Sequence, residues 1–463
     1  MHRIVWILAT VALCARALGG DADSHGRCMD RLDTTQAAAI GGARLPELHY
    51  ECLLLANGRA LWVGDSGISA KDTVLLVHGL GDNAHRDWRN VVPELVEEFR
   101  VIALDLPGFG ASEMSADAIT FEALAATLDE LLRRRQVERA HVVGHSLGAA
   151  LSLHFAWTHP QRVDRLVLVD VAGILQESVY VRHLAQFGAE TSAFRRAVSG
   201  LTVNLMRKVD GKLEPTAWLA RNPTIRASLF GDSPQIDAAL NLIQQNFAPA
   251  IRATQAPTTI IWGRDDAIAP LRTGLLLASR MQHARLHVLD DVGHVPMSAA
   301  PREFNALLRS ALQDPIAKQA PTVVATESQG DVICKSQNNL RYTGTFNSLR
   351  LVNCANVLLE DAVLGRLVIA ESTAELRNVS VDSKVALVAK GSVIVGTNVQ
   401  LRGVIAIRGD SSELDLAGAS LQASRKALHL SSSARVYLSV SDIRSPSYTG
   451  DAHGVYTRGT RNQ

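Results

Sequence analysis

The 463-residue sequence has almost no excess of charge of either sign, with 47 Lys and Arg against 46 Asp and Glu. It also lacks a run of basic residues and a cluster of cysteines and histidines at zinc-binding spacing. The composition therefore predicts no nucleic-acid partner, no acidic membrane as partner, no metal site and no cofactor. A chain of this length exceeds what one hydrophobic core usually supports, which predicts two or three domains.

The apolar run near the N-terminus, residues 4–15, is too short to span a bilayer comfortably. It follows a short basic start, and small residues cluster at its end. This pattern predicts a secretory signal peptide over residues 1–20, cut between about Ala17 and Gly20. An uncleaved membrane anchor is the alternative. We therefore expect an exported protein, periplasmic or secreted, that contacts the membrane only through its signal peptide.

Cysteine is scarce, with five residues in the whole chain. Cys14 lies within the expected signal peptide and would leave with it. The other four allow three pairings, of which the two local ones, Cys28–Cys52 and Cys334–Cys354, are the simplest. An exported protein provides the oxidising conditions that such bonds need.

The most informative stretch is Gly144-His145-Ser146-Leu147-Gly148. It follows a short apolar run and precedes a segment of small and apolar residues that is typical of a buried helix. A Gly-x-Ser-x-Gly turn between a strand and a helix is typical of a nucleophile elbow, which lifts the serine hydroxyl clear of the sheet. Because the pentapeptide alone also arises by chance, the residues that follow must decide its meaning.

Short apolar strands alternate with helical segments on both sides of this turn. Predicted strands cover residues 73–77, 101–104, 166–169, 259–262 and 286–289, a hairpin covers residues 48–63, and helices cover residues 91–99, 121–135 and 301–312. Such alternation predicts an α/β fold with a mostly parallel sheet and helices on both faces. It stops at about residues 173–248, where a helical composition with scattered aromatic residues predicts a cap over the sheet.

Five motifs in this order resemble the α/β-hydrolase superfamily, in its capped, serine esterase and lipase branch. They are His78-Gly79-Leu80-Gly81, residues 105–112, residues 144–148, residues 262–266 with Pro270 behind them, and Gly293-His294-Val295-Pro296. The resemblance covers residues 45–313, within a predicted hydrolase domain of residues 21–313. It implies that Ser146 is the nucleophile, His294 its base and Asp266 the acid that orients the imidazole. The backbone N–H groups of Leu80 and Leu147 would form the oxyanion hole.

Four further polar residues of these motifs and strands have other interpretations. Asp170 ends another strand and is the alternative acid. We expect His78 to hold its loop by hydrogen bonds, His145 to line the pocket wall, and Asp265 to be a solvated or salt-bridged neighbour of Asp266.

After Leu312 the composition changes. Residues 314–330 predict a linker, and residues 331–463 predict an all-β domain with short strands that recur roughly every 18–22 residues. The repeated strands cover residues 349–352, 367–370, 385–388, 404–407 and 427–430, with a further strand at 393–395. This period favours a parallel β-solenoid, with a small β-sandwich as the alternative. By analogy such a domain binds a glycan or a surface, and we expect it to be separable from the chemistry.

These observations predict an exported serine hydrolase that cleaves a small-molecule ester or lipid through an acyl-enzyme. The same triad could instead serve acyl transfer, perhydrolysis or hydrolysis of a carbon–carbon bond. A surface-binding protein with a vestigial hydrolase domain is the alternative from another class.

Overall fold

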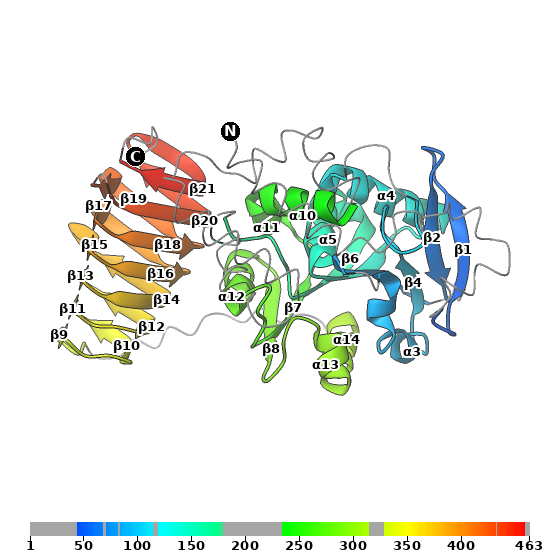
Figure 1. Ribbon diagram of the computed structural model, residues 1–463, viewed down its shortest axis with the longest axis horizontal. Coiled ribbons are helices and arrows are strands. Elements are labelled where there is room, and N and C mark those ends of the chain that lie inside the picture. Colours follow the sequence, from blue (N-terminus) through cyan, green and yellow to red (C-terminus); the bar gives the residue numbers. More distant parts are fainter. Residues whose placement is uncertain are drawn as a thin grey trace, which may run out of the picture.

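The computed structural model describes residues 44–67, 71–81, 84–113, 119–176, 179, 234–313, 328–431 and 433–458. The expected signal peptide, Cys28, most of the expected cap and most of the expected linker lie outside the described residues. The described residues form an N-terminal α/β domain and a C-terminal β-domain, residues 328–458 (Figure 1). Within these residues, no helix is both long and apolar enough to cross a membrane.

An eight-stranded sheet forms the centre of the N-terminal domain, in the order β1-β2-β4-β3-β5-β6-β7-β8. The pairs β1–β2 and β2–β4 are antiparallel, and the other neighbours are parallel. This confirms the mostly parallel sheet and the hairpin. The strands are β1 His49–Leu54, β2 Ala60–Asp65, β3 Thr73–Val77, β4 Arg100–Leu104, β5 Ala140–His145, β6 Val163–Val169, β7 Thr258–Gly263 and β8 Ala284–Leu289.

Helices cover both faces of this sheet, and each face has its own apolar core. One face packs against α4 Phe121–Arg134, α5 Leu147–Thr158, α10 Pro234–Gln244, α11 Ala248–Ala253 and α12 Leu271–Arg280. The other packs against α3 Val92–Leu95, α13 Pro296–Ala299 and α14 Pro301–Gln313. The expected helix over residues 91–99 is too long, because α3 ends at Leu95 and turn hydrogen bonds from the Glu98 and Phe99 N–H groups follow it.

The β-domain consists of parallel strands in which each strand pairs with the next but one along the chain. One series is β9 Asp331–Lys335, β11 Ser348–Val352, β13 Leu367–Ala370, β15 Val385–Lys390, β17 Gln400–Asp410 and β19 Ser420–Leu430. The other is β10 Arg341–Phe346, β12 Val357–Leu364, β14 Thr373–Asp382, β16 Val393–Thr397, β18 Glu413–Ala417 and β20 Arg435–Ser445. A last strand, β21 Tyr448–Thr457, pairs antiparallel with β20.

Stacked apolar side chains fill the centre of the β-domain. In the strand register Leu349, Leu367, Leu387, Ile407 and Leu428 lie opposite one another in turn, and all five are fully buried. These residues belong to the five repeated strands that the sequence predicts. The expected disulfide between Cys334 and Cys354 is also present, close to the first of these strands.

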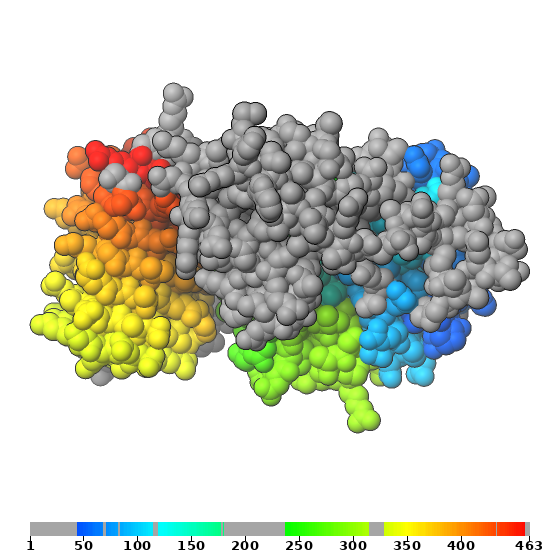
Figure 2. Space-filling model, viewed as in Figure 1, coloured from blue at the N-terminus to red at the C-terminus, as the bar shows by residue number. Residues whose placement is uncertain are grey.

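The β-domain lies at one end of the molecule and residues 44–113 at the other (Figure 2). The two domains are in direct contact. Three residues of the β-domain, Ala417, Tyr437 and Val440, are buried within an apolar core of the N-terminal domain. The Gln176 N–H donates to the Ser439 hydroxyl over 2.8 Å. The domains are therefore joined by a packed surface in addition to the expected linker.

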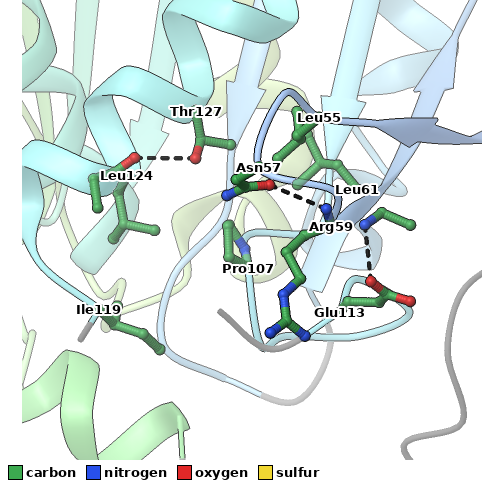
Figure 3. A pocket seen from close by; sticks show the side chains of 11 residues that line it. Leu55, Asn57, Arg59, Leu61, Pro107, Glu113, Ile119, Leu124 and Thr127 are labelled. Carbon is green, nitrogen blue, oxygen red and sulfur yellow. Dashed lines mark hydrogen bonds between the residues drawn. The ribbon is translucent and has the colours of Figure 1, made fainter. Parts of the chain in front are cut away.

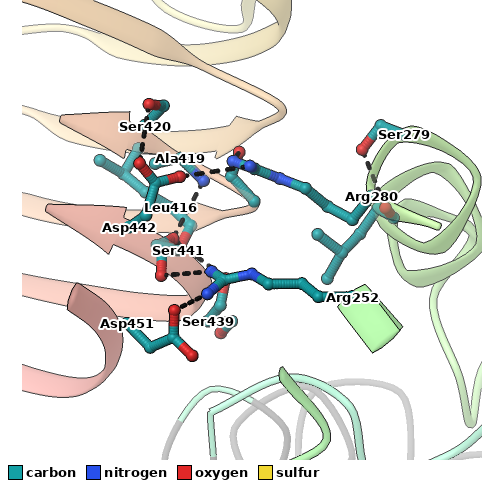
Figure 4. A network of polar contacts seen from close by, with 12 residues as sticks. Arg252, Ser279, Arg280, Leu416, Ala419, Ser420, Ser439, Ser441, Asp442 and Asp451 are labelled. Carbon is teal, nitrogen blue, oxygen red and sulfur yellow. Dashed lines mark hydrogen bonds and ion pairs between the residues drawn. The ribbon is translucent and has the colours of Figure 1, made fainter. Parts of the chain in front are cut away.

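Three arginines of the N-terminal domain reach acidic residues and carbonyls of the β-domain, and two of them are labelled in Figure 4. Arg252 pairs with Asp451 and donates to the Ser441 carbonyl. Arg280 pairs with Asp442 and donates to the Gly418 carbonyl. The third, Arg272, makes a two-pronged contact with Asp415, whose side chain is 14% exposed against 13% for that of Arg272.

We expect Arg272→Met to lower the free energy of unfolding by about 3 kcal/mol, because it leaves the largely buried Asp415 carboxylate without its partner. Chemical denaturation followed by circular dichroism measures the change. Arg133→Met, which removes a more exposed ion pair to Asp129, is the matched control and should cost less than about 1 kcal/mol. Equal losses for the two variants would mean that the contact between domains contributes nothing specific.

Candidate active site

The turn between β5 and α5 holds Ser146 in a strained backbone conformation, with φ of 53° and ψ of −116°. Two glycines make this turn feasible. A Cβ on Gly144 would lie 2.3 Å from the Gly148 carbonyl oxygen, and one on Gly148 would lie 2.3 Å from the carbonyl oxygens of Val77 and His78. Any larger residue at either position would push the strand and helix apart. The arrangement is that of the expected nucleophile elbow.

The structure brings together Ser146, His294 and Asp266 from three separate loops. The Ser146 Oγ lies 3.0 Å from the His294 Nε2, and the His294 Nδ1 lies 2.7 Å from the Asp266 Oδ2. The other Asp266 oxygen accepts hydrogen bonds from the Ile268 and Ala269 N–H groups, which fix the carboxylate in place. Burial lowers the pKa of His294 below 6.5, although its hydrogen bond to Asp266 acts in the opposite direction. The imidazole is therefore neutral at neutral pH and able to accept a proton.

The two expected oxyanion-hole residues lie on either side of Ser146. Leu147 is the first residue of α5, so its N–H belongs to the helix end whose donors have no partner within the helix. Leu80 follows Gly79, whose backbone passes so close to the serine that a Cβ there would lie 3.1 Å from the Ser146 Cβ. Both residues thus belong to backbone close to Ser146, as an oxyanion hole would require.

His78 holds its loop, as expected. Its ring is fully buried, its Nδ1 donates to the Gly79 carbonyl over 2.6 Å, and its Nε2 accepts from the Leu106 N–H over 2.9 Å. Burial lowers the pKa of His78, which keeps the ring in the neutral form that these two bonds require. The ring thus ties the loop after β3 to the loop after β4.

His145 and Asp265 differ in their surroundings. The buried His145 donates from Nε2 to the His294 carbonyl over 2.7 Å, so it positions the backbone of the expected base. Its Nδ1 lies 3.8 Å from the Asp87 carboxylate. Asp265 is exposed, as expected of a solvated neighbour. Sequence reasoning missed Asp87, because it lies on a short 3₁₀ helix, Ala84–Trp88, that carries no motif.

Asp170, the alternative acid, does not contact the imidazole in place of Asp266. It is fully buried at the end of β6, and its Oδ1 accepts a hydrogen bond from the Gly263 N–H over 3.0 Å. Its Oδ2 has no hydrogen-bond partner among the described residues. Burial and the neighbouring Asp266 charge raise the pKa of Asp170 well above 3.8. The raised pKa keeps Asp170 protonated to a higher pH than an ordinary aspartic acid, which limits the negative charge at the site.

A metal ion would fit poorly beside this site. One ligand atom each of His145, Asp170 and His294 lies within 4.8 Å of the others. However, both ring nitrogens of His294 already contact Ser146 and Asp266, and a protonated Asp170 is a weak ligand. The donor set therefore suits proton transfer better than metal binding.

A separate pocket lies between the β1–β2 turn, the loop after β4 and the start of α4 (Figure 3). Leu55, Leu61, Ile119 and Leu124 supply its apolar wall, and the Glu113 carboxylate accepts a hydrogen bond from the Ala60 N–H nearby. None of its lining residues is Ser146, His294 or Asp266. The pocket is therefore distinct from the expected catalytic centre.

A model of a protein family described as alpha/beta hydrolase fold matches residues 72–301. The chain is 33% identical over 270 residues to a 2-hydroxy-6-oxo-2,4-heptadienoate hydrolase of Pseudomonas putida, a match that covers 56% of this chain and 95% of the relative. It is 32% identical over 259 residues to a 2-hydroxymuconate semialdehyde hydrolase of a Pseudomonas species, covering 54% and 88%. An uncharacterised protein of Mycobacterium tuberculosis is 31% identical over 270 residues, covering 53% and 75%.

We expect Asp170→Asn to stabilise the protein increasingly as pH rises from 4 to 7. The pKa of Asp170 is higher in the folded protein than the value of about 3.9 in the unfolded chain. Above that pH the unfolded chain releases the proton while the folded protein keeps it, so the free energy of unfolding of the wild type falls as pH rises. The amide never ionises, and it can keep the acceptor that binds the Gly263 N–H. The gain should be small at pH 4 and larger at pH 7, as measured by urea unfolding at each pH. A gain independent of pH would contradict a neutral Asp170.

Proposed function

Because the chain belongs to the α/β-hydrolase family and holds Ser146, His294 and Asp266 in hydrogen-bonding sequence, we propose that it cleaves carboxylic esters through an acyl-enzyme on Ser146. The observation that carries this proposal is the placement of one imidazole between the serine hydroxyl, at 3.0 Å, and the carboxylate, at 2.7 Å. Serine is a weak nucleophile until such a base removes its proton.

In the proposed reaction, the His294 Nε2 takes the proton as the Ser146 Oγ attacks the ester carbonyl carbon. The negative charge on the carbonyl oxygen then forms beside the N–H groups of Leu80 and Leu147. When the carbon–oxygen bond to the alcohol breaks, His294 returns the proton to the departing oxygen. Water, deprotonated by the same imidazole, then attacks the acyl carbon. The carbon–oxygen bond to Ser146 breaks as His294 returns that proton to the Ser146 Oγ, and the acid leaves. Asp266 stabilises the imidazolium at each stage.

Hydrolysis of a carbon–carbon bond is the second candidate. Two relatives at 32–33% identity are named for substrates of that chemistry, a semialdehyde and an oxo-dienoate. The same residues would serve, since the carbon leaving group also needs a proton from a nearby acid. The two candidates share these residues and differ in the substrate that the site accepts.

Export and surface attachment remain part of the proposal. The basic and apolar pattern of residues 1–20 supports a signal peptide, and the Cys334–Cys354 disulfide suits an oxidising compartment. The β-domain has two series of parallel strands, and the chain passes from one series to the other and back. This arrangement supports a solenoid. We propose that this domain binds a surface or a glycan rather than taking part in the chemistry.

We expect Ser146→Ala to lower kcat/KM on p-nitrophenyl acetate by at least about 10⁴-fold without unfolding the protein. The fold should survive because the Ser146 side chain makes no capping hydrogen bond to α5. Ser279→Ala removes the hydroxyl of an exposed residue of α12. It is the control and should keep the wild-type rate. A Ser146→Ala variant with more than a tenth of the wild-type rate would exclude Ser146 as nucleophile.

The pH dependence of kcat/KM should show its acid limb below pH 6.5, because burial lowers the pKa of His294 and only the neutral imidazole accepts the serine proton. In Asp266→Asn the limb should move further down, since the lost carboxylate had raised that pKa. The plateau rate should fall by on the order of 10³–10⁴-fold. An acid limb that moves upward in this variant would contradict the assignment of Asp266 as the partner of His294.

The two candidate substrates can be compared directly. We expect kcat/KM for the preferred member of a p-nitrophenyl ester series of increasing acyl length to exceed that for 2-hydroxymuconate semialdehyde, because the proposed site is complementary to the transition state of ester cleavage. The reverse order would establish carbon–carbon hydrolysis as the activity.

A further inference from the structure

One face of the β-domain lies away from the N-terminal domain (Figure 1). It is made by β9, β11, β13 and β15, by residues 405–410 of β17 and by residues 426–430 of β19. We call the outward-pointing side chains of these segments the outer face. In the described residues, the hydrogen bonds and ion pairs between domains involve β16, β18, β20, β21 and the turn after β18. The outer face is therefore free of that contact.

The strand register arranges the outer face in two rows. One row runs across six strands through Ile333, Arg350, Val368, Val388, Arg408 and His429. The row beside it runs through Lys335, Val352, Ala370, Lys390 and Asp410. Since neighbouring strands are about 4.8 Å apart, the first row extends over roughly 24 Å. Each row contains two Lys or Arg residues with two aliphatic side chains between them.

Cations dominate the outer face and the residues that directly flank its strands. These exposed cations are Lys335, Arg350, Arg366, Lys384, Lys390, Arg408, Arg425 and Lys426, against the exposed anions Asp331, Glu371 and Asp410. None of the eight cations has an ion-pair partner within 4.0 Å in the described part of the chain. On the other sides of the β-domain, by contrast, Arg341, Arg377 and Arg402 are paired with carboxylates.

Charge in the β-domain is therefore divided between its sides. The acids Asp415, Asp442 and Asp451 face the N-terminal domain, where arginines pair with them. The eight cations of the outer face and its flanks, by contrast, lie on the side that points to solvent. The near-zero charge of the whole chain does not reveal this local excess of cations, because it sums over all 463 residues.

The outer face also carries exposed aliphatic surface. Ile333 is 59% exposed, and Val368 and Val388 are half-buried between the two arginines of their row. Neither row contains a Phe, Tyr or Trp on which a nucleic-acid base could stack. A face that carries both cations and exposed aliphatic side chains is complementary to a lipid surface, where anionic headgroups lie above apolar acyl chains.

We propose that the outer face binds an anionic lipid headgroup layer. Arg350 and Arg408 would contact phosphate groups about 14 Å apart, with Lys335 and Lys390 in the neighbouring row beside them. Ile333 would enter the interface between headgroups and acyl chains. Each Lys or Arg near an anionic surface typically favours binding by about fivefold. This contact departs from the expectation, drawn from the overall composition, of no acidic membrane as partner and of membrane contact through the signal peptide only.

The test is sedimentation of the full chain with phospholipid vesicles. Wild-type protein should bind vesicles of phosphatidylcholine with about one-quarter phosphatidylglycerol and should not bind vesicles of pure phosphatidylcholine. About 0.5 M NaCl should release the bound protein. The variant Lys335→Gln/Arg350→Gln/Lys390→Gln/Arg408→Gln should bind on the order of 100-fold more weakly. The matched control, Arg133→Gln/Arg134→Gln/Arg264→Gln/Arg309→Gln, removes the same charge from the N-terminal domain and should bind within about threefold of wild type.

Three results would overturn the proposal. Equal binding to charged and neutral vesicles would exclude headgroup charge as the determinant. Equal losses in both variants would assign binding to net charge and not to the outer face. Binding to polygalacturonate that the outer-face variant abolishes, without binding to vesicles, would make an acidic polysaccharide the ligand. Unchanged circular dichroism in each variant excludes unfolding as the cause.

Discussion

The close approach of backbone at residues 144–148 is the constraint on which the rest of the N-terminal domain depends. Gly148 lies against the carbonyls that end β3, and Gly144 lies against Gly148 itself, with no room for a side chain at either position. That approach sets the start of α5 over the end of the sheet and leaves Ser146 with a left-handed φ. The loops after β3, β7 and β8 then supply Leu80, Asp266 and His294 around a serine whose position is already determined.

The cost of burying charge is the second constraint. Two carboxyl groups, Asp170 and Asp266, are buried close together, and the raised pKa of Asp170 favours its neutral form. Asp266 has two backbone N–H donors and an imidazole, whereas Asp170 has one donor and full burial. Their different surroundings assign the anion to Asp266. At the interface between domains three arginines neutralise three carboxylates, two of which, Asp415 and Asp442, are partly buried. Both arrangements avoid an unpaired charge in a low-dielectric environment.

Sequence patterns predicted the features that are local or periodic. The order of the five motifs predicted which residues would meet at the end of the sheet, and the spacing of Leu349, Leu367 and Leu387 predicted the strands whose side chains stack in the β-domain. The choice between Asp266 and Asp170 needed three-dimensional neighbours, because each ends a strand. The contact of Arg272 with Asp415 joins residues 143 positions apart, and neither residue carries a motif. The cation rows of the outer face likewise emerge only when the register of six strands is known.

Covalent labelling of the serine tests the central claim most directly. Wild-type protein treated with a fluorophosphonate should gain one adduct, and peptide mass spectrometry should place it on Ser146. His294→Ala should react far more slowly, because the hydroxyl then has no base within hydrogen-bonding distance. An adduct on another residue, or equally fast labelling of the His294→Ala variant, would contradict the account of Ser146 as a nucleophile activated by His294.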